Sequence, residues 1–149
     1  MNHSIVKIDV ENYSLFDDMV YWRMNGSERL SLKKEAISQS ILNELCNPNL
    51  FIYAVEVESR YVGWISLVYT LKVGKHSGYG HVYVDELWIQ PSYRKNRFAY
   101  ELMKKAEELK QEKRATGIRL YVNVDSISAK KLYEKCDFSV SCSAYLMEK

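Results

Sequence analysis

Two adjacent carboxylates, Asp85 and Glu86, lie in an otherwise apolar stretch, YVDELWIQ. We expect a buried strand over residues 83–90, which Pro91 ends because proline cannot donate to a strand ladder. A basic loop, residues 92–97, then leads into a helix. Helix N-termini attract anions through their free N–H groups and their dipole. The stretch therefore places an anion site beside two carboxylates, which indicates an enzyme that handles a phosphorylated cofactor.

Composition limits the other functions. The length of 149 residues suits a single domain, residues 1–149, and the formal net charge of +2 does not indicate a nucleic-acid-binding protein. The three cysteines form no CxxC pair and have no metal-like spacing, so we expect free thiols and no metal site. We find no signal-peptide pattern and no apolar run of about 18 residues, the length that spans a membrane. We therefore expect a soluble, cytoplasmic protein that binds neither membranes nor nucleic acid.

Hydrophobic periodicity and turn signals predict the elements that hold these residues. Strands are expected over residues 5–10, 51–57, 61–73, 83–90, 118–123, 138–140 and 144–147. Helices are expected over residues 12–25, from Ser31 to about 45, from about 98 to 116, and from Ser126 or Ser128 to 135. The order is β α α β β β α β α β β. It indicates an α/β (α+β) fold in which about four helices cover both faces of a mixed, mostly antiparallel twisted sheet of six to seven strands.

Two motifs in the second half resemble those of the GNAT superfamily of N-acetyltransferases. The cofactor loop of that family reads Q/R-x-x-G-x-G/A after a strand and Pro-x-Tyr. This chain has Pro91 and Tyr93 followed by RKNRFA, in which Arg94 and Ala99 fit the motif. Arg97 departs from it, because it stands at the position of the first glycine.

The later motif of the family reads Asn-x-x-Ala-x-x-x-Tyr-x-x-x-Gly-Phe. Residues 126–138, SISAKKLYEKCDF, match it at Ala129, Tyr133 and Phe138, with Ser126 in place of the asparagine and Asp137 in place of the glycine. Because both motifs occur in the right order, separated by one helix and one strand, the chain is identified as a GNAT-like N-acetyltransferase over essentially its whole length.

The resemblance implies a binding site for acetyl-CoA. The loop would hold the pyrophosphate through backbone N–H groups and added positive charge, using Arg94, Lys95, Asn96, Arg97, Phe98 and Ala99. The strand before the loop would diverge from the strand at 118–123, so that backbone groups of Leu87, Trp88 and Ile89 bond the pantetheine arm. Ser126 would bond the pantetheine or cap its helix. An arginine in place of glycine puts the affinity for the cofactor in question, since glycine permits a positive φ.

The implied reaction is the attack of a neutral amine on a thioester within a ternary complex. An alkyl ammonium must first lose a proton, and Asp85 and Glu86 are the candidate bases. Since neighbours on a strand point to opposite faces, we expect only one of them to face the cleft. The resemblance places Asp85 at the base position, with Glu86 binding a cationic substrate or anchoring the sheet. Purely structural roles for both remain the alternative.

Tyr133 stands at the general-acid position of the family, where it would protonate the departing CoA thiolate or stabilise the sulfur anion. A core tyrosine is the alternative reading of this residue. The acceptor side would be formed by the two early helices and the strand at 61–73. Its plausible lining residues are Tyr21, Trp22, Met24, Glu28 and Tyr69.

The acceptor is expected to be a small amine: a polyamine, an aminoglycoside, or a peptide or amino-acid amine. The late strands, residues 138–147, are candidates for pairing across a homodimer. The rival hypothesis is a non-catalytic acyl-CoA-binding regulatory domain of the same fold, since Arg97 and Asp137 both replace motif glycines.

Overall fold

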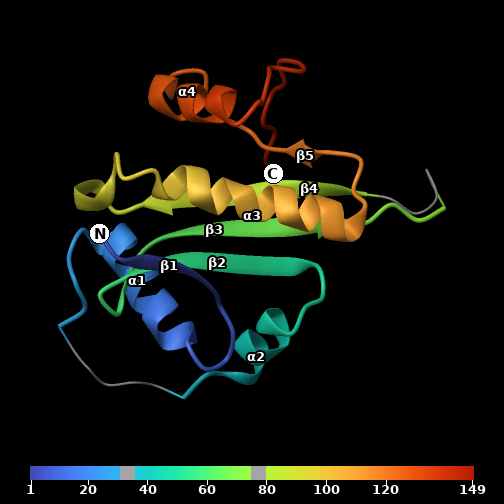
Figure 1. The fold of residues 1–149 in the computed structure, drawn as a ribbon. Helices are drawn as coiled ribbons and strands as arrows, with labels where there is room; N and C mark the ends of the chain where they lie inside the picture. Colours follow the sequence, from blue (N-terminus) through green and yellow to red (C-terminus); the bar gives the residue numbers. More distant parts are fainter. Residues whose placement is uncertain (31–35, 75–79) are drawn as a thin grey trace.

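One mixed sheet forms the centre of the computed structural model, which describes residues 1–30, 36–74 and 80–149 (Figure 1). The strands follow their sequence order across the sheet, and all neighbours are antiparallel except β4 and β5, which are parallel. The strands are β1 (His3–Lys7), β2 (Leu50–Val57), β3 (Arg60–Thr70), β4 (His81–Ile89) and β5 (Ile118–Arg119). The helices are α1 (Tyr13–Asn25), α2 (Gln39–Leu45), α3 (Phe98–Lys113) and α4 (Ile127–Lys135), with a 3-10 turn, η2, at Pro91–Tyr93.

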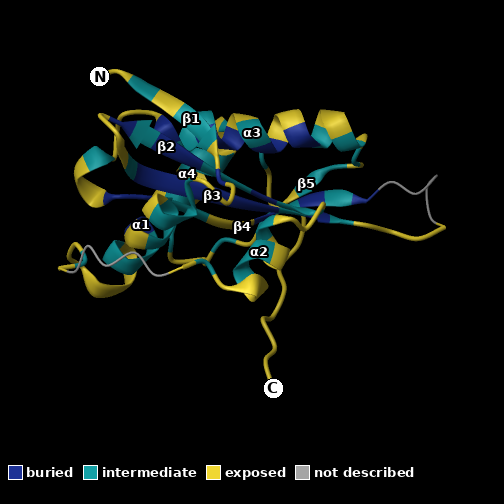
Figure 2. Ribbon diagram, turned by 90° about the horizontal axis from the view of Figure 1, so that it is seen from below, coloured by how far each residue is buried: buried dark blue, intermediate teal, exposed yellow. Residues whose placement is uncertain are grey.

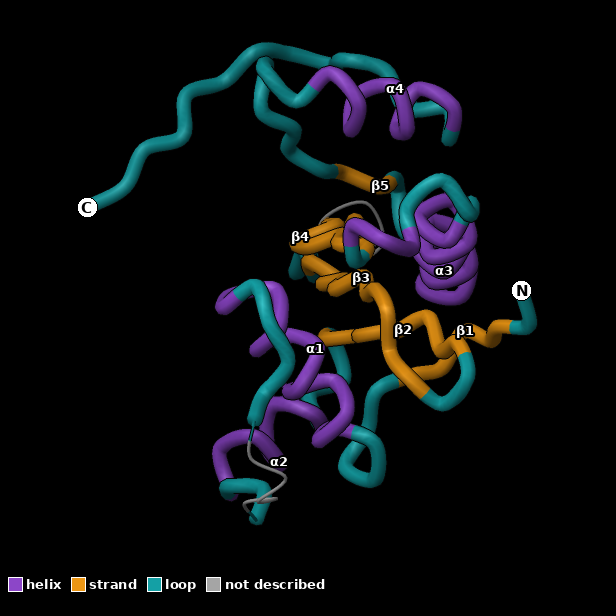
Figure 3. Tube along the Cα trace, turned by 90° about the vertical axis from the view of Figure 1, so that its left-hand side faces the viewer, coloured by secondary structure: helices purple, strands orange, loops and turns teal. Residues whose placement is uncertain are grey.

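The predicted order is confirmed for its first nine elements, from β1 to α4. Within the described residues, however, the sheet has five strands, not the six to seven that were predicted. The missing strands are the last two. Residues 138–147 carry a strand-like pattern but pair with no other strand, and every residue from 139 to 149 is exposed. Figures 2 and 3 show this stretch leaving the body of the protein as an extended tail.

Helices cover both faces of the sheet, as predicted (Figure 3). On one face α3 packs over a core that includes Ile65, Leu67 and Leu102. On the other face α1 packs through Met19 against a smaller cluster that includes Trp64. Adjacent residues of β3 thus serve different layers, because side chains alternate along a strand. We call the two sides the α3 face and the α1 face.

Side chains at the ends of the early elements explain where the boundaries differ from the prediction. β1 ends at Lys7 because the Asp9 carboxylate accepts hydrogen bonds from the backbone N–H groups of Glu11 and Asn12, which turns the chain toward α1. The predicted helix at 12–25 is confirmed, and Gly26 ends it with a φ of 73°. The next helix begins late, at Gln39, because Ser38 caps it by accepting from the N–H of Ile41. The predicted cap, Ser31, lies outside the described residues.

The strands predicted over residues 51–57 and 61–73 leave residues 58–60 for a turn, and the turn between β2 and β3 uses only two of them. Glu58 and Ser59 both have a positive φ, 49° and 64°, as a two-residue hairpin turn requires. β3 ends at Thr70, short of the predicted residue 73. β5 is only two residues long instead of six, because its pairing with β4 stops at Arg119. Among the described residues, no helix combines the length and hydropathy of a membrane span.

Candidate active site

A β-bulge interrupts β4 at the two carboxylates. Ser66 lies opposite Glu86 and Leu67 lies opposite Val84, so Asp85 has no partner on β3. Val84 packs in the core on the α3 face, whereas Glu86 binds a residue of α1. Residues two apart therefore lie on opposite faces, which regular alternation forbids and a bulge produces. The prediction that Asp85 and Glu86 must point to opposite faces rested on regular alternation, and that alternation is broken here.

An arginine of α1 holds Glu86. Arg23 Nη1 lies 2.6 Å from Glu86 Oε2, and the two side chains keep 41% and 44% of their exposure. The guanidinium of Arg23 also lies over the ring of Trp64, 5.2 Å from its centroid. Asp85 is exposed and forms no ion pair with any described residue. The two neighbouring carboxylates thus differ, since Glu86 is paired with an arginine and Asp85 is not.

Arg23 and Trp64 are not among the site residues predicted from the sequence. Helical spacing offered a signal for Arg23, because it follows Met19, the buried residue of α1, by four positions and so lies on the same face. Trp64 pairs across the ladder with Trp88 of β4, and their rings lie 5.0 Å apart. The buried indole N–H of Trp64 has no acceptor among the described residues.

Beyond its first residues, β4 has a free edge on the side of β5. Pairing with β5 is limited to Val82 with Ile118 and Tyr83 with Arg119. The N–H of Gln90 donates to Val62 of β3, so by alternation Trp88 also bonds β3, whereas the backbone groups of Leu87 and Ile89 point toward the free edge. Of the three residues expected to bond pantetheine, Leu87 and Ile89 therefore have the suitable backbone orientation and Trp88 does not.

The basic loop joins this edge to the N-terminus of α3. Arg94 Nε donates to the carbonyl oxygen of Ile89 at 3.1 Å, and Asn96 Nδ2 donates to the carbonyl oxygen of Tyr93 at 3.1 Å. The backbone N–H groups from Lys95 to Tyr100 donate to no described residue. Phe98 is buried in the core and anchors the first turn of α3. The loop thus presents free N–H donors at a helix N-terminus among basic side chains, an arrangement suited to a phosphate.

Both residues that replace motif glycines keep a glycine-like backbone. Arg97 has a φ of 66° and Asp137 a φ of 65°, both in the left-handed region. Aspartate tolerates this region better than arginine does, because its short side chain can hydrogen-bond locally. Lys95 also has a positive φ of 67°. The loop therefore has the backbone form that glycine would allow, at the cost of strain at Arg97.

Tyr133 lies on α4 and packs, half-buried, against the core on the α3 face. Its ring makes an edge contact with Phe138 at 6.1 Å between centroids. Burial, with a smaller contribution from Cys136, raises the pKa of the Tyr133 phenol above its ordinary value. The phenol is therefore a neutral proton donor at physiological pH. Tyr133 and Glu86 contact residues on opposite faces of the sheet.

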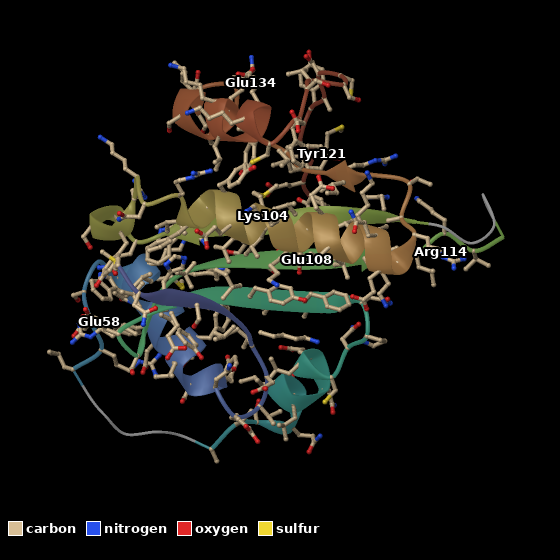
Figure 4. All side chains as sticks on the ribbon, viewed as in Figure 1. Glu58, Lys104, Glu108, Arg114, Tyr121 and Glu134 are labelled. Carbon is tan, nitrogen blue, oxygen red and sulfur yellow. The ribbon has the colours of Figure 1, made fainter. Side chains whose placement is uncertain are left out.

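Ser126 takes the N-cap position of α4, but its side chain caps no backbone N–H. Its hydroxyl is therefore not engaged in the capping role that was one of its two predicted alternatives. Tyr121 lies between β5 and α4 (Figure 4). Its ring centroid is 5.9 Å from that of Tyr83.

The residues expected to line the acceptor side do not all lie on one face of the sheet. Tyr69 packs on the α3 face, where its hydroxyl accepts a hydrogen bond from the N–H of Gly80. Tyr21 lies under the guanidinium of Arg29, and Glu28 pairs with Arg60 at 3.3 Å. Trp22 is half-buried and Met24 is exposed.

Comparison with known proteins identifies the family. The model of the acetyltransferase (GNAT) family matches residues 16–138. No curated protein matches the sequence. Among solved structures, an aminoglycoside acetyltransferase from an uncultured soil metagenomic sample is similar with a TM-score of 0.80 and 14% identity, covering 100% of this chain and 99% of that one.

Two further structures have the same fold. A ribosomal-protein-alanine N-acetyltransferase from Brucella melitensis biovar Abortus 2308 has a TM-score of 0.75 and 15% identity, and 100% of each chain is covered. An aminoglycoside N-acetyltransferase in complex with CoA has a TM-score of 0.75 and 12% identity, with 98% of each chain covered.

Proposed function

From the premise that the chain belongs to the GNAT family and is an acetyl-CoA-dependent N-acetyltransferase, we propose that it acetylates a primary amine of a small molecule or peptide. The transfer is direct. The amine nitrogen attacks the thioester carbonyl carbon in a ternary complex, the C–S bond breaks, and CoA leaves without an acyl-enzyme intermediate.

The observation that carries this proposal is the continuous set of donors from β4 to α3. The N–H groups from Lys95 to Tyr100 have no acceptor among the described residues and are available to an anion, and Arg94 bonds back to Ile89 at the free edge of β4. A pyrophosphate at the loop and a pantetheine arm along Leu87 and Ile89 would use adjoining parts of one surface. The extended arm would take the role of an additional strand, since the edge offers backbone donors and acceptors. Ser126, whose hydroxyl caps nothing, is a further candidate to bond the arm.

Asp85 is the proposed base. It carries no ion pair among the described residues, so its carboxylate can accept the ammonium proton directly or through a water. Glu86 is already bonded to Arg23, which makes it the weaker candidate. Tyr133 is the proposed acid, because its half-buried phenol has a raised pKa, is protonated at neutral pH and can give that proton to the CoA sulfur as the C–S bond breaks.

The experiment that tests this function combines isothermal titration with a transfer assay. Saturable micromolar binding of acetyl-CoA, with acetylation of an amine from a panel of polyamines, aminoglycosides, amino acids and peptides, is the expected result. Binding with no acetylation of any of these classes favours the alternative, a non-catalytic acyl-CoA-binding regulatory domain. No binding at millimolar acetyl-CoA refutes both.

We also infer a homodimer formed through residues 139–147, the exposed part of the tail that was expected to pair across a dimer over residues 138–147. Its residues alternate between apolar side chains and mostly serine, as a strand with one buried face does. Val140 and Leu146 are 67% and 86% exposed, so the apolar face has no cover from the described residues. A second copy can cover it. Multi-angle light scattering of the full chain and of a chain ending at Phe138 is the test, and a full chain that is monomeric at high micromolar concentration would refute the dimer.

A further inference from the structure

We propose that Arg23 selects acceptor amines that also carry a carboxylate, by binding that carboxylate beside the reacting nitrogen. This inference rests on the proposed N-acetyl transfer and narrows its acceptor class. It assigns the site to Arg23 of α1, on the α1 face at the bulge of β4, with Asp85 as the group that meets the amine.

Arg23 is held in place from two directions. Its Nη1 is bonded to Glu86 Oε2 at 2.6 Å, and its guanidinium lies over the buried ring of Trp64 at 5.2 Å. Trp64 is 1% exposed and packs against Trp88 and Phe16, so the platform under the guanidinium is fixed. An arginine fixed in this way loses little further side-chain entropy when it binds an anion.

The remaining donors of Arg23 are available to a ligand. Its Nε and Nη2 make no hydrogen bond to any described residue, and its side chain keeps 41% of its exposure. A position in the last turn of α1 explains a positive charge there through the helix dipole. The helix dipole does not explain why the guanidinium is bonded through only one nitrogen, Nη1, while its other donors have no acceptor among the described residues. A planar donor fork is the group that matches a carboxylate with two parallel hydrogen bonds.

Charges at the bulge favour an acceptor of mixed charge. Arg23, Asp85 and Glu86 together carry one positive and two negative charges, with the positive charge bonded to Glu86. A polycation can pair with Asp85, but it offers no acceptor to the remaining donors of Arg23. An amino acid, or a short peptide with an acidic group near its amine, can instead place its ammonium at Asp85 and its carboxylate at Arg23.

Matched acceptors that differ only in the carboxylate test this inference. Each amino acid is compared with its own amide, and lysine with cadaverine, by kcat/KM for acetyl transfer in the wild type and in Arg23→Met. We expect the wild type to favour the acid over the amide by about tenfold or more, as a charge-assisted hydrogen bond would produce. Arg23→Met should remove this preference and improve turnover of cadaverine and polyamines relative to amino acids.

Two control variants separate the role of Arg23 from folding and from charge alone. Lys105→Met removes one positive charge from an ion pair with Glu108 on α3, on the other side of the sheet, and should leave the acid-to-amide ratio unchanged. Arg23→Lys keeps the charge but loses the fork, so it should retain only part of the preference. Equal rates for acids and amides in the wild type overturn the inference, as does an unchanged ratio in Arg23→Met.

Failure of the inference can be told from failure of the proposed function. If the wild type acetylates polyamines or aminoglycosides but no matched acid, the transferase function stands and the selection by Arg23 is wrong. If no amine is acetylated although acetyl-CoA binds, the proposed catalysis and the inference both fall, and the non-catalytic alternative remains.

Discussion

Arg94 and Ile89 are joined by a hydrogen bond, from the Nε of the arginine to the carbonyl oxygen of the strand residue, at 3.1 Å. The bond ties the basic loop to the last residue of β4. One nitrogen of the side chain is therefore used for structure, and the terminal nitrogens stay available for an anion. Arg94 belongs to the basic loop and also contacts the free edge of β4 at Ile89, so its substitution should affect both regions.

We expect Arg94→Met to weaken acetyl-CoA binding about tenfold or more, because it removes a charge-assisted donor to the pyrophosphate and frees the Ile89 carbonyl. Isothermal titration measures this. Lys104→Met is the matched control, since Lys104 is an exposed cation of α3 that lies over Tyr100 (Figure 4). Equal losses of affinity in the two variants would show that the loop attracts the cofactor only through its overall charge.

Arg97→Gly should stabilise the protein by about 1 kcal/mol, because glycine adopts a φ of 66° without the clash that a Cβ causes. Thermal or urea unfolding gives the free-energy change. Arg97→Ala is the control, since it removes the guanidinium but keeps the strained backbone. If the loop binds phosphate through its amides alone, neither variant should change the affinity for acetyl-CoA by more than about twofold, and a larger loss in both would assign the guanidinium a direct contact.

Asp85→Asn should lower kcat/KM by about 10²-fold, with the greatest loss at low pH, where deprotonation of the amine limits the rate. Glu86→Gln should leave the shape of the pH–rate profile unchanged, because Glu86 is already bonded to Arg23. The pH dependence of kcat/KM in the three proteins is the measurement. An Asp85→Asn profile parallel to that of the wild type would exclude Asp85 as the base.

Tyr133→Phe should reduce kcat by about 10²-fold and leave the affinity for acetyl-CoA nearly unchanged, since only the proton donor is lost. The ring still packs against Phe138. Pre-steady-state rates and titration of acetyl-CoA separate the two quantities. Parallel losses in rate and in affinity would mean that Tyr133 serves the core and not the sulfur.

His3 should make stability fall as the pH rises past neutrality. Its Nε2 lies 2.8 Å from Glu101 Oε2, and this hydrogen bond raises the pKa of His3 above the ordinary value of 6.5. A raised pKa in the folded state adds stability below pH 6.5 that is lost as the pH passes through the folded value. The effect is small because both side chains are part-exposed. Melting temperatures from about pH 5.5 to about pH 8.5 should decrease for the wild type relative to His3→Gln; identical curves would contradict the linkage.

Periodicity predicted most of the fold because burial imposes it. The buried apolar face of α3 and the apolar runs of β2 to β4 leave few alternatives, and their order is confirmed. Periodicity failed to predict the tail. A period-two pattern indicates that a segment can form a strand, but the strand forms only if it can pair with an edge, and the position of that edge depends on the tertiary structure. Residues 138–147 have the pattern but, in the described chain, pair with no edge.

The candidate site was predicted in its residue types and not in its geometry. The acid pair, the basic loop and the mismatch at Arg97 can all be recognised in the sequence. The positive φ of Arg97 cannot, because backbone conformation at a loop is set by the elements on both sides. The partnership of Arg23 with Glu86 joins residues 63 positions apart, a contact that only the packing of α1 on the sheet creates.

Because of the bulge, Asp85 is an extra residue in β4 that has no partner on β3. If Asp85 were deleted, Glu86 would directly follow Val84 with ordinary alternation, so both halves of β4 would keep their present faces and partners. The fold therefore gains nothing from the residue, which fills no core and lengthens no ladder. A chain that keeps such a residue keeps it for its carboxylate or for the distortion it causes, and a one-residue deletion would show what the enzyme does without both.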